Sequence, residues 1–265
     1  MTKGIRRYWG AAGPWRPSFG RLVPLPATRS ESVSSLHLVI AHNLHSVNWS
    51  FAIGYFFHRR KGDKMTKNIV LDIGNVLVDW NPKGAMRELG FSEEVVQKVA
   101  AATVETDFWN EADRGVLSSE EILEEFHKRS PELREEINLF WNHVELSLHQ
   151  FSYTKDWIHS MKEQGFHVYI LSNYGDWTYQ KTKEKALDFL PLVDGAILSY
   201  TVKQIKPNAD IYQTLLSRFG LTAEECVFID DRLENVEGAK REGIHGIHFC
   251  TIEQARKELE AYGCR

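Results

Sequence analysis

The chain has 265 residues, 43% of them hydrophobic and 26% charged, which suits one globular core domain with an accessory part. A formal net charge of −4 gives no basic footprint for nucleic acid, and no uninterrupted run of about 18 apolar residues predicts a membrane-spanning helix. The three cysteines, Cys226, Cys250 and Cys264, lack metal-ligand spacing, which favours a reduced, cytoplasmic protein.

The first 64 residues differ from the rest in charge. They carry ten basic and two acidic residues, hence +8, whereas the remainder is −12. Scattered prolines and glycines predict no core element there. A disordered basic tail and a targeting peptide are two interpretations. We favour a third, a non-native extension before a natural start at Met65, because Lys61-Gly62-Asp63 can be encoded as AAA-GGA-GAT, which contains a bacterial ribosome-binding sequence.

From Met65 onward, strand and helix patterns alternate. Short apolar runs predict five strands, over Asn68–Ile73, Phe166–Leu171, Val193–Ser199, Cys226–Ile229 and Ile244–Cys250. Helical periodicity follows them, over Trp177–Phe189, Ala209–Phe219, Leu233–Glu242 and Ile252–Ala261. This alternation predicts an α/β fold with a doubly wound, parallel, five-stranded Rossmannoid sheet.

A helical insert separates the first two strands, which lie about 90 residues apart, too far for an ordinary crossover. Its predicted helices are Pro82–Leu89, Glu93–Val104, Ser118–Arg129 and Pro131–Leu148. Ser92 and Ser118 read as N-caps, and Ser118 with Glu121 forms a capping box. We therefore predict a core made of residues 65–79 and 152–265, with a helical cap at 80–151.

Polar side chains gather where the predicted strands end, and in an open α/β sheet the site lies at that edge. They are Asp72, Ser172, Asn173, Lys206, Asp230 and Asp231. Three neighbouring carboxylates cannot all ionise without a cation, and Mg²⁺ suits oxygen ligands. Asp72 is then the candidate nucleophile toward phosphorus, while Ser172 and the backbone amide of Asn173 bind phosphoryl oxygens and Lys206 neutralises charge.

Four motifs in this order carry a family resemblance. Asp72-Ile-Gly-Asn-Val-Leu, Leu171-Ser172-Asn173, Lys206-Pro207 and Phe228-Ile229-Asp230-Asp231 resemble those of the haloacid dehalogenase (HAD) superfamily, and the insert resembles its C1-type cap. Within it, Glu111-Ala-Asp-Arg-Gly-Val and the pair Ile211-Tyr212 look most like the alpha-D-glucose-1-phosphate phosphatase group. The phosphatase domain of bifunctional epoxide hydrolases is a related relative.

The resemblance implies a site, carried over residue by residue. The expected catalytic residues are Asp72, Lys206 and Ser172, and Asn235 is an expected supporting residue. The expected metal ligands are Asp72, the carbonyl of Gly74, Asp231 (the more direct of the acidic pair) and Asp230. The expected substrate contacts are Asn75, Ser172, Asn173, Lys206, Arg114 and Trp80. Trp80, Phe108 and Trp109 fit cap core as well as a pocket wall, and Arg114 fits a plain surface position.

One position departs from the superfamily pattern. Where its phosphatases usually carry an acid/base two residues after the nucleophile, this chain has Gly74. One explanation is a leaving group that needs little protonation, such as the anomeric hydroxyl of a sugar 1-phosphate. The alternative is a proton donor elsewhere, namely Asp79 or a cap residue such as Asp113.

The predicted function is a Mg²⁺-dependent phosphomonoesterase for a small phosphorylated metabolite, such as the sugar phosphate glucose 1-phosphate, through an aspartyl phosphate on Asp72. No nucleic-acid or membrane partner is expected. A non-catalytic protein that binds a phosphorylated ligand or a partner is one alternative. A 2-haloacid dehalogenase is a weaker one, because such enzymes lack the acidic pair seen here at Asp230 and Asp231.

Overall fold

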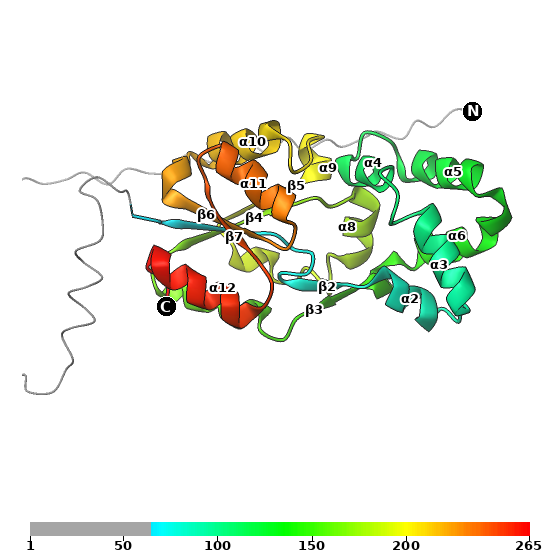
Figure 1. Ribbon diagram of the computed structural model, residues 1–265, viewed down its shortest axis with the longest axis horizontal. Coiled ribbons are helices and arrows are strands. Elements are labelled where there is room, and N and C mark those ends of the chain that lie inside the picture. The colour runs from blue at the N-terminus through cyan, green and yellow to red at the C-terminus, as the bar shows by residue number, and fades with distance from the viewer. Residues whose placement is uncertain (1–64) are drawn as a thin grey trace, which may run out of the picture. The chain divides into compact units, whose positions relative to one another are not determined.

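A five-stranded parallel sheet forms the centre of the computed structural model, which describes residues 65–265 (Figure 1). The interpretations of residues 1–64 lie outside the described residues. The strands are β1 (Asn68–Leu71), β4 (His167–Ser172), β5 (Gly195–Leu198), β6 (Cys226–Asp230) and β7 (His245–His248). Their spatial order is β5-β4-β1-β6-β7, and every neighbouring pair is parallel. The predicted fold class is confirmed.

Helices cover both faces of this sheet. They are α7 (Thr154–Glu163), α8 (Asp176–Thr182), α9 (Ser199–Val202), α10 (Ala209–Phe219), α11 (Leu233–Arg241) and α12 (Ile252–Leu259). Helices α10 and α11 lie on one face and α12 on the other (Figure 1). Apolar side chains of α7 and α12 share a buried cluster with Ile69 and Leu71, whereas those of α10 and α11 share one with Val70. Because successive strand residues point to opposite faces, β1 contributes to both clusters.

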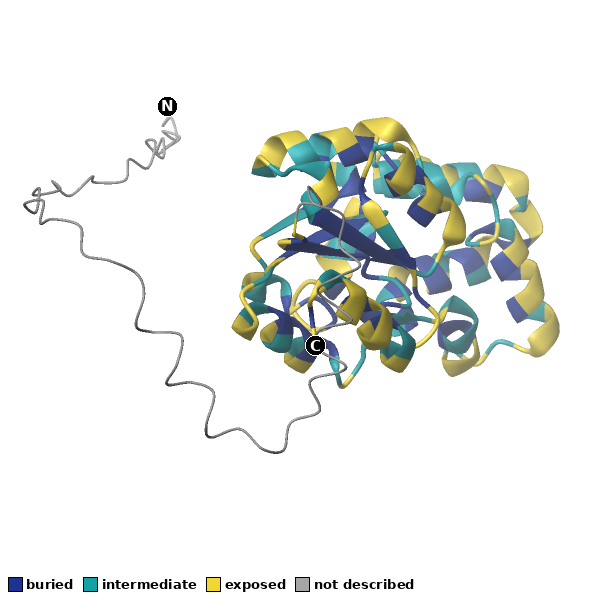
Figure 2. Ribbon diagram, turned by 60° about the vertical axis from the view of Figure 1, so that its left-hand side comes forward, coloured by how far each residue is buried: buried dark blue, intermediate teal, exposed yellow. Residues whose placement is uncertain are grey.

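A second group of helices lies between two short strands, β2 (Val78–Trp80) and β3 (Leu148–Gln150), which pair antiparallel. We call it the helical unit: α2 (Pro82–Glu88), α3 (Glu93–Ala102), α4 (Trp109–Arg114), α5 (Ser119–Arg129) and α6 (Arg134–Asn142). It has its own apolar cluster, which includes Met86, Phe126 and Phe140. The carboxyl ends of the sheet strands face this unit (Figure 1). Figure 2 shows the dark, buried strands between helices whose outer faces are exposed.

Helix boundaries follow local signals where these are strong. Helix α10 has the predicted bounds, and the capping box of Ser118 with Glu121 is present at α5. The expected helix over Pro131–Leu148 is instead divided into α6 and two 3₁₀ turns, and α8 ends seven residues earlier than expected. The 3₁₀ helices are Pro131–Leu133, Val144–Ser147, Leu190–Leu192, Ala223–Glu225 and Glu260–Tyr262.

Two short α-helices and two short strands are among the elements that were not predicted. Helices α4 and α9 have six and four residues, too short for helical periodicity to mark them. Strands β2 and β3 have three residues each and pair only because the fold brings their two segments together. Within residues 65–265, no helix is long and apolar enough to cross a membrane.

Candidate active site

Three carboxylates meet at the carboxyl end of the sheet. Asp72 follows β1, and Asp230 with Asp231 closes the neighbouring strand β6. Leu71 is in register with Ile229, and the backbone amide of Asp72 donates to the Ile229 carbonyl at 2.9 Å, so the two strand ends lie level. One oxygen from each carboxylate lies within 4.8 Å of the others. The sheet register therefore creates the acidic cluster that the sequence predicted.

Lys206 lies between two of these carboxylates. Its Nζ is 2.8 Å from Oδ1 of Asp72 and 2.6 Å from Oδ2 of Asp230, and its side chain is 1% exposed. Burial lowers the pKa of Lys206, but the charges of Asp230 and Asp72 outweigh burial and raise this pKa overall. The lysine is therefore a fixed cation beside the candidate nucleophile.

Asp72 itself is 6% exposed. Burial raises the pKa of its carboxyl to about 7, with added repulsion from Asp230 and Asp231 and with Lys206 acting in the opposite direction. One ammonium group thus faces three acidic side chains, which leaves excess negative charge in a buried place. A bound cation would offset this excess negative charge, and would thereby favour the ionised form of each carboxylate.

Asp230 and Asp231 differ in how many hydrogen bonds their carboxylate oxygens already accept. Both oxygens of Asp230 accept hydrogen bonds, from Lys206, from the backbone amide of Arg232 at 2.8 Å and from Nδ2 of Asn235 at 3.0 and 3.1 Å. Asp230 is fully buried. The carboxylate of Asp231 accepts one hydrogen bond, from Nδ2 of Asn75 at 2.8 Å, and Asp231 lines the adjoining cavity. Burial is the main cause that raises the pKa of Asp231.

The donor set fits magnesium. It consists of carboxylate oxygens, and Gly74, which has a backbone carbonyl to offer, lines the same cavity. Mg²⁺ prefers oxygen ligands and keeps some water. Asp72, Asp231 and the Gly74 carbonyl are the groups that could hold the ion. Asp230 instead holds Lys206 and Asn235 in place.

Ser172, the last residue of β4, and Asn173, which follows it, also contribute to the site. Ser172 is 2% exposed and lines the cavity. The Asn173 side chain accepts from the backbone amide of Lys206 at 2.8 Å and donates to the Lys206 carbonyl at 3.1 Å. This paired contact joins the β4 loop to the segment that carries the lysine.

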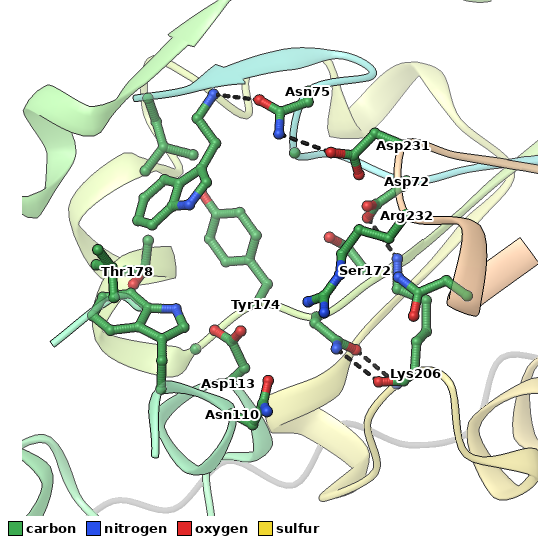
Figure 3. A pocket seen from close by; sticks show the side chains of 18 of the residues that line it. Asp72, Asn75, Asn110, Asp113, Ser172, Tyr174, Thr178, Lys206, Asp231 and Arg232 are labelled. Carbon is green, nitrogen blue, oxygen red and sulfur yellow. Dashed lines mark hydrogen bonds and ion pairs between the residues drawn. The ribbon is translucent and has the colours of Figure 1, made fainter. Parts of the chain in front are cut away.

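Asp72, Asp231, Lys206 and Ser172 form the floor of a cavity of about 310 Å³, which opens toward the helical unit. Trp80 of β2 and Trp109 of α4 form part of its wall, with ring centroids 5.8 Å apart. Polar side chains from the helical unit also line it, namely Glu105, Thr106, Asp107, Asn110 and Asp113. Figure 3 shows Asn110 and Asp113 entering the cavity on a different side from Asp72 and Asp231.

The expected substrate contacts separate into two groups. Asn75, Trp80, Ser172, Asn173 and Lys206 all line the cavity. Arg114 does not line the cavity: its Nε lies 3.3 Å from a carboxylate oxygen of Glu111, three residues earlier on α4.

For four other residues, only the structure shows whether they line the cavity. Phe108 packs edge-on against Phe126 and does not line this cavity, and neither does Asp79. Arg232 and Thr178 do line it, although neither was expected there from the sequence. Arg232 directly follows the acidic pair, so its position beside the fourth motif was the available signal. Thr178 carried none.

Comparisons with known proteins identify the family of this chain. The family model of haloacid dehalogenase-like hydrolases matches residues 66–243. The chain is 24% identical to a sesquiterpene phosphatase of Aspergillus oryzae, over 75% of this chain and 97% of that protein. It is 25% identical to a D-ribitol-5-phosphate phosphatase of Bacteroides thetaiotaomicron, over 74% and 97% respectively.

Solved structures share the fold. A HAD family enzyme of Bacteroides thetaiotaomicron, determined in variant form with magnesium and inorganic phosphate, superposes with a TM-score of 0.60 at 20% identity. The match covers 73% of this chain and 98% of that one. With the family model spanning most of residues 65–265 and the four motifs meeting at one sheet edge, the chain belongs to the haloacid dehalogenase-like hydrolases.

Proposed function

We propose that this hydrolase is a Mg²⁺-dependent phosphomonoesterase that forms an aspartyl phosphate on Asp72. The observation that carries the proposal is the floor of the cavity. There Asp72 lies beside the buried ammonium of Lys206 and within 4.8 Å of two further carboxylates. This arrangement suits a phosphate monoester, whose negative charge an uncompensated carboxylate nucleophile would repel.

Each residue has a stated role in the proposal. An oxygen of Asp72 attacks phosphorus, and Lys206 stabilises the charge that develops on the phosphoryl oxygens. The Ser172 hydroxyl and the backbone amide of Asn173 donate hydrogen bonds to those oxygens. Asp231, Asp72 and the Gly74 carbonyl would hold the Mg²⁺, which when bound would cancel repulsion between the carboxylate and the phosphate. Residues 80–151 serve as the cap over the core.

The cavity wall bears on the substrate class. Its volume of about 310 Å³ suits a small metabolite. Trp80 and Trp109 offer apolar surface to the cavity, while Asn110 and Thr106 line it with hydrogen-bonding groups. A sugar has both an apolar ring face and several hydroxyls. We therefore place a sugar phosphate, such as glucose 1-phosphate, in this cavity.

The relatives define the rest of the substrate panel. One is named a sesquiterpene phosphatase, another a D-ribitol-5-phosphate phosphatase and a third a flavin mononucleotide hydrolase. The panel accordingly contains glucose 1-phosphate, glucose 6-phosphate, D-ribitol 5-phosphate, farnesyl phosphate and flavin mononucleotide. An isoprenoid ester would use mainly the tryptophan wall, whereas sugar and polyol esters would also need Asn110.

The test is phosphate release from this panel with and without Mg²⁺. Turnover that disappears in Asp72→Asn and after chelation supports the mechanism. Faster turnover of a sugar phosphate than of farnesyl phosphate, with the sugar activity reduced in Asn110→Ala, supports the substrate class. If no ester releases phosphate in the presence of Mg²⁺, the phosphatase proposal is wrong and a phosphate-binding role replaces it.

A further inference from the structure

The proposed chemistry needs a proton that the floor of the site does not supply. When Asp72 displaces an alcohol from phosphorus, the leaving oxygen carries negative charge until a proton reaches it. Two residues beyond Asp72 stands Gly74, which has no side-chain donor. Lys206 already interacts with two carboxylates. The Tyr174 hydroxyl is engaged with Thr182 at 2.7 Å, and burial raises its pKa strongly.

Among the described residues, five carboxylic acids line the cavity: Asp72, Glu105, Asp107, Asp113 and Asp231. The first is the nucleophile and the last belongs to the metal-holding group. Glu105 is 48% exposed and forms an ion pair with Lys83 at 2.7 Å. Asp107 is also exposed, so both of these carboxyl groups are in contact with solvent. Asp113 is the carboxyl group left within the cavity.

Asp113 projects from α4 into the cavity that Asp72 also lines (Figure 3). It is half-buried. Burial raises the pKa of its carboxyl to about 7, and the charge of Asp72 adds to this increase. Lys206, the backbone amide of Gly175 and Arg232 face it and act in the opposite direction. The carboxyl therefore holds a proton near neutral pH and can also release it, as an acid–base group must.

Three contacts hold α4 against the core. The buried hydroxyl of Ser199 donates to the backbone carbonyl of Asp113 and accepts from the backbone amide of Tyr174 at 2.8 Å. The Nζ of Lys203 donates to the carbonyl of Gly115, directly after α4. Gly175 packs so closely that an added Cβ would lie 2.9 Å from the Ala112 carbonyl oxygen. The backbone of Asp113 is thus tied to the loop that follows Ser172.

We propose that Asp113, from the helical unit, is the acid–base catalyst of this active site; the inference rests on the phosphatase function proposed above. In the first step the Asp72 oxygen bonds to phosphorus, the bond from phosphorus to the alcohol oxygen breaks, and the Asp113 proton passes to that oxygen. In the second step water attacks phosphorus, gives a proton to the Asp113 carboxylate, and the bond to Asp72 breaks. Inorganic phosphate leaves and both aspartates return to their starting states.

The experiment compares two esters of similar size in Asp113→Asn. Nitrophenolate leaves without a proton, whereas the alkoxide of benzyl alcohol needs one. Rapid-quench measurement of the first turnover separates this step from the later hydrolysis. We expect benzyl phosphate cleavage to slow by about 10²–10⁴-fold, and p-nitrophenyl phosphate cleavage by less than about threefold. The covalent phosphoenzyme should then accumulate, because the base for its hydrolysis is missing.

Glu111→Gln is the matched control, because Glu111 is a carboxylate on the same helix that does not line the cavity. It should leave the first turnover of both esters within about twofold of the unmodified protein. An equal loss on both esters in Asp113→Asn would mean that Asp113 only positions the site, and an unchanged benzyl phosphate rate would exclude it as the acid. If the unmodified protein cleaves neither ester, the phosphatase function itself fails, and the inference with it.

Discussion

The Nζ of Lys206 lies 2.8 Å from Oδ1 of Asp72, although the two residues come from separate segments of the core. Asp72 directly follows the central strand β1, and Lys206 lies in the loop before α10. The second bond of Lys206, to Asp230, fixes the ammonium from the other side at 2.6 Å. Removal of this cation would leave two carboxylates buried without compensation.

Lys206→Met should therefore lose both activity and stability. We expect turnover to fall by at least about 10²-fold and the free energy of unfolding to fall by about 3–5 kcal/mol, because a buried charge pair has lost one partner. Lys240→Met is the control, since its ion pair with Glu237 is about half exposed and contributes no more than about 1 kcal/mol. Phosphate release and urea denaturation measure the two effects. Similar stability losses in both variants would contradict the role of the buried pair.

Asn75 should set the affinity for Mg²⁺ through Asp231. Its Nδ2 donates to Asp231 at 2.8 Å, and its Oδ1 accepts from the backbone amide of Trp80 at 3.2 Å, which fixes the amide's orientation. Loss of a residue that orients a metal ligand typically weakens binding by about 10–100-fold. Isothermal titration of Asn75→Ala with Mg²⁺ should show this range. Asn208→Ala, at an exposed position before α10, should bind Mg²⁺ normally; equal affinities in the two variants would refute the role.

The raised pKa of Asp113 predicts a pH-dependent stability. Its ordinary pKa applies in the unfolded chain, and its folded pKa is about 7, so the folded protein binds more protons between these values. The contribution of Asp113 to stability is thus fully present below the ordinary pKa and lost as pH rises through about 7. Relative to the unmodified protein, Asp113→Asn should gain a few degrees in Tm, roughly 2–4 °C per kcal/mol, between pH 5 and pH 8.

This difference should be measured in EDTA, so that metal binding does not contribute. Glu111→Gln should show no such gain across the same range. A constant difference in Tm between Asp113→Asn and the unmodified protein at both pH values would contradict the assignment of the raised pKa.

Gly74 offers a test by rescue. An added Cβ at Gly74 meets no atom within 4 Å, and its φ lies outside the left-handed region, so a side chain fits there. In the Asp113→Asn background, Gly74→Asp should restore benzyl phosphate cleavage by at least about tenfold, because it returns a carboxylic acid close to Asp72. Gly74→Ala in the same background adds a methyl group that carries no acidic proton, and it should not restore benzyl phosphate cleavage. Equal rates in the two double variants would show that proton supply is not the defect.

Much of the core could be predicted because its signals are local. Apolar runs that end in Asp72 and Asp230 mark buried parallel strands, and a parallel sheet brings its carboxyl ends to one edge. The acidic cluster and Lys206 followed from that rule alone. The substrate contacts were harder to predict from the sequence. Trp80 lines the cavity, whereas Arg114 forms an ion pair with Glu111 and does not line it. Helical periodicity in a six-residue helix does not reveal which side faces a neighbouring domain.

The sequence by itself determined the order of strands and helices, the acids at the strand ends and the absence of an acid at position 74, since each is a property of neighbouring residues. Only the tertiary structure decided which distant groups meet. The docking of α4 through Ser199 places Asp113 in the cavity that Asp72 also lines, and the pairing of β2 with β3 places Trp80 against Trp109. Burial and nearby charge, which raise the pKa of Asp113, arise from that packing and have no trace in the chain around it.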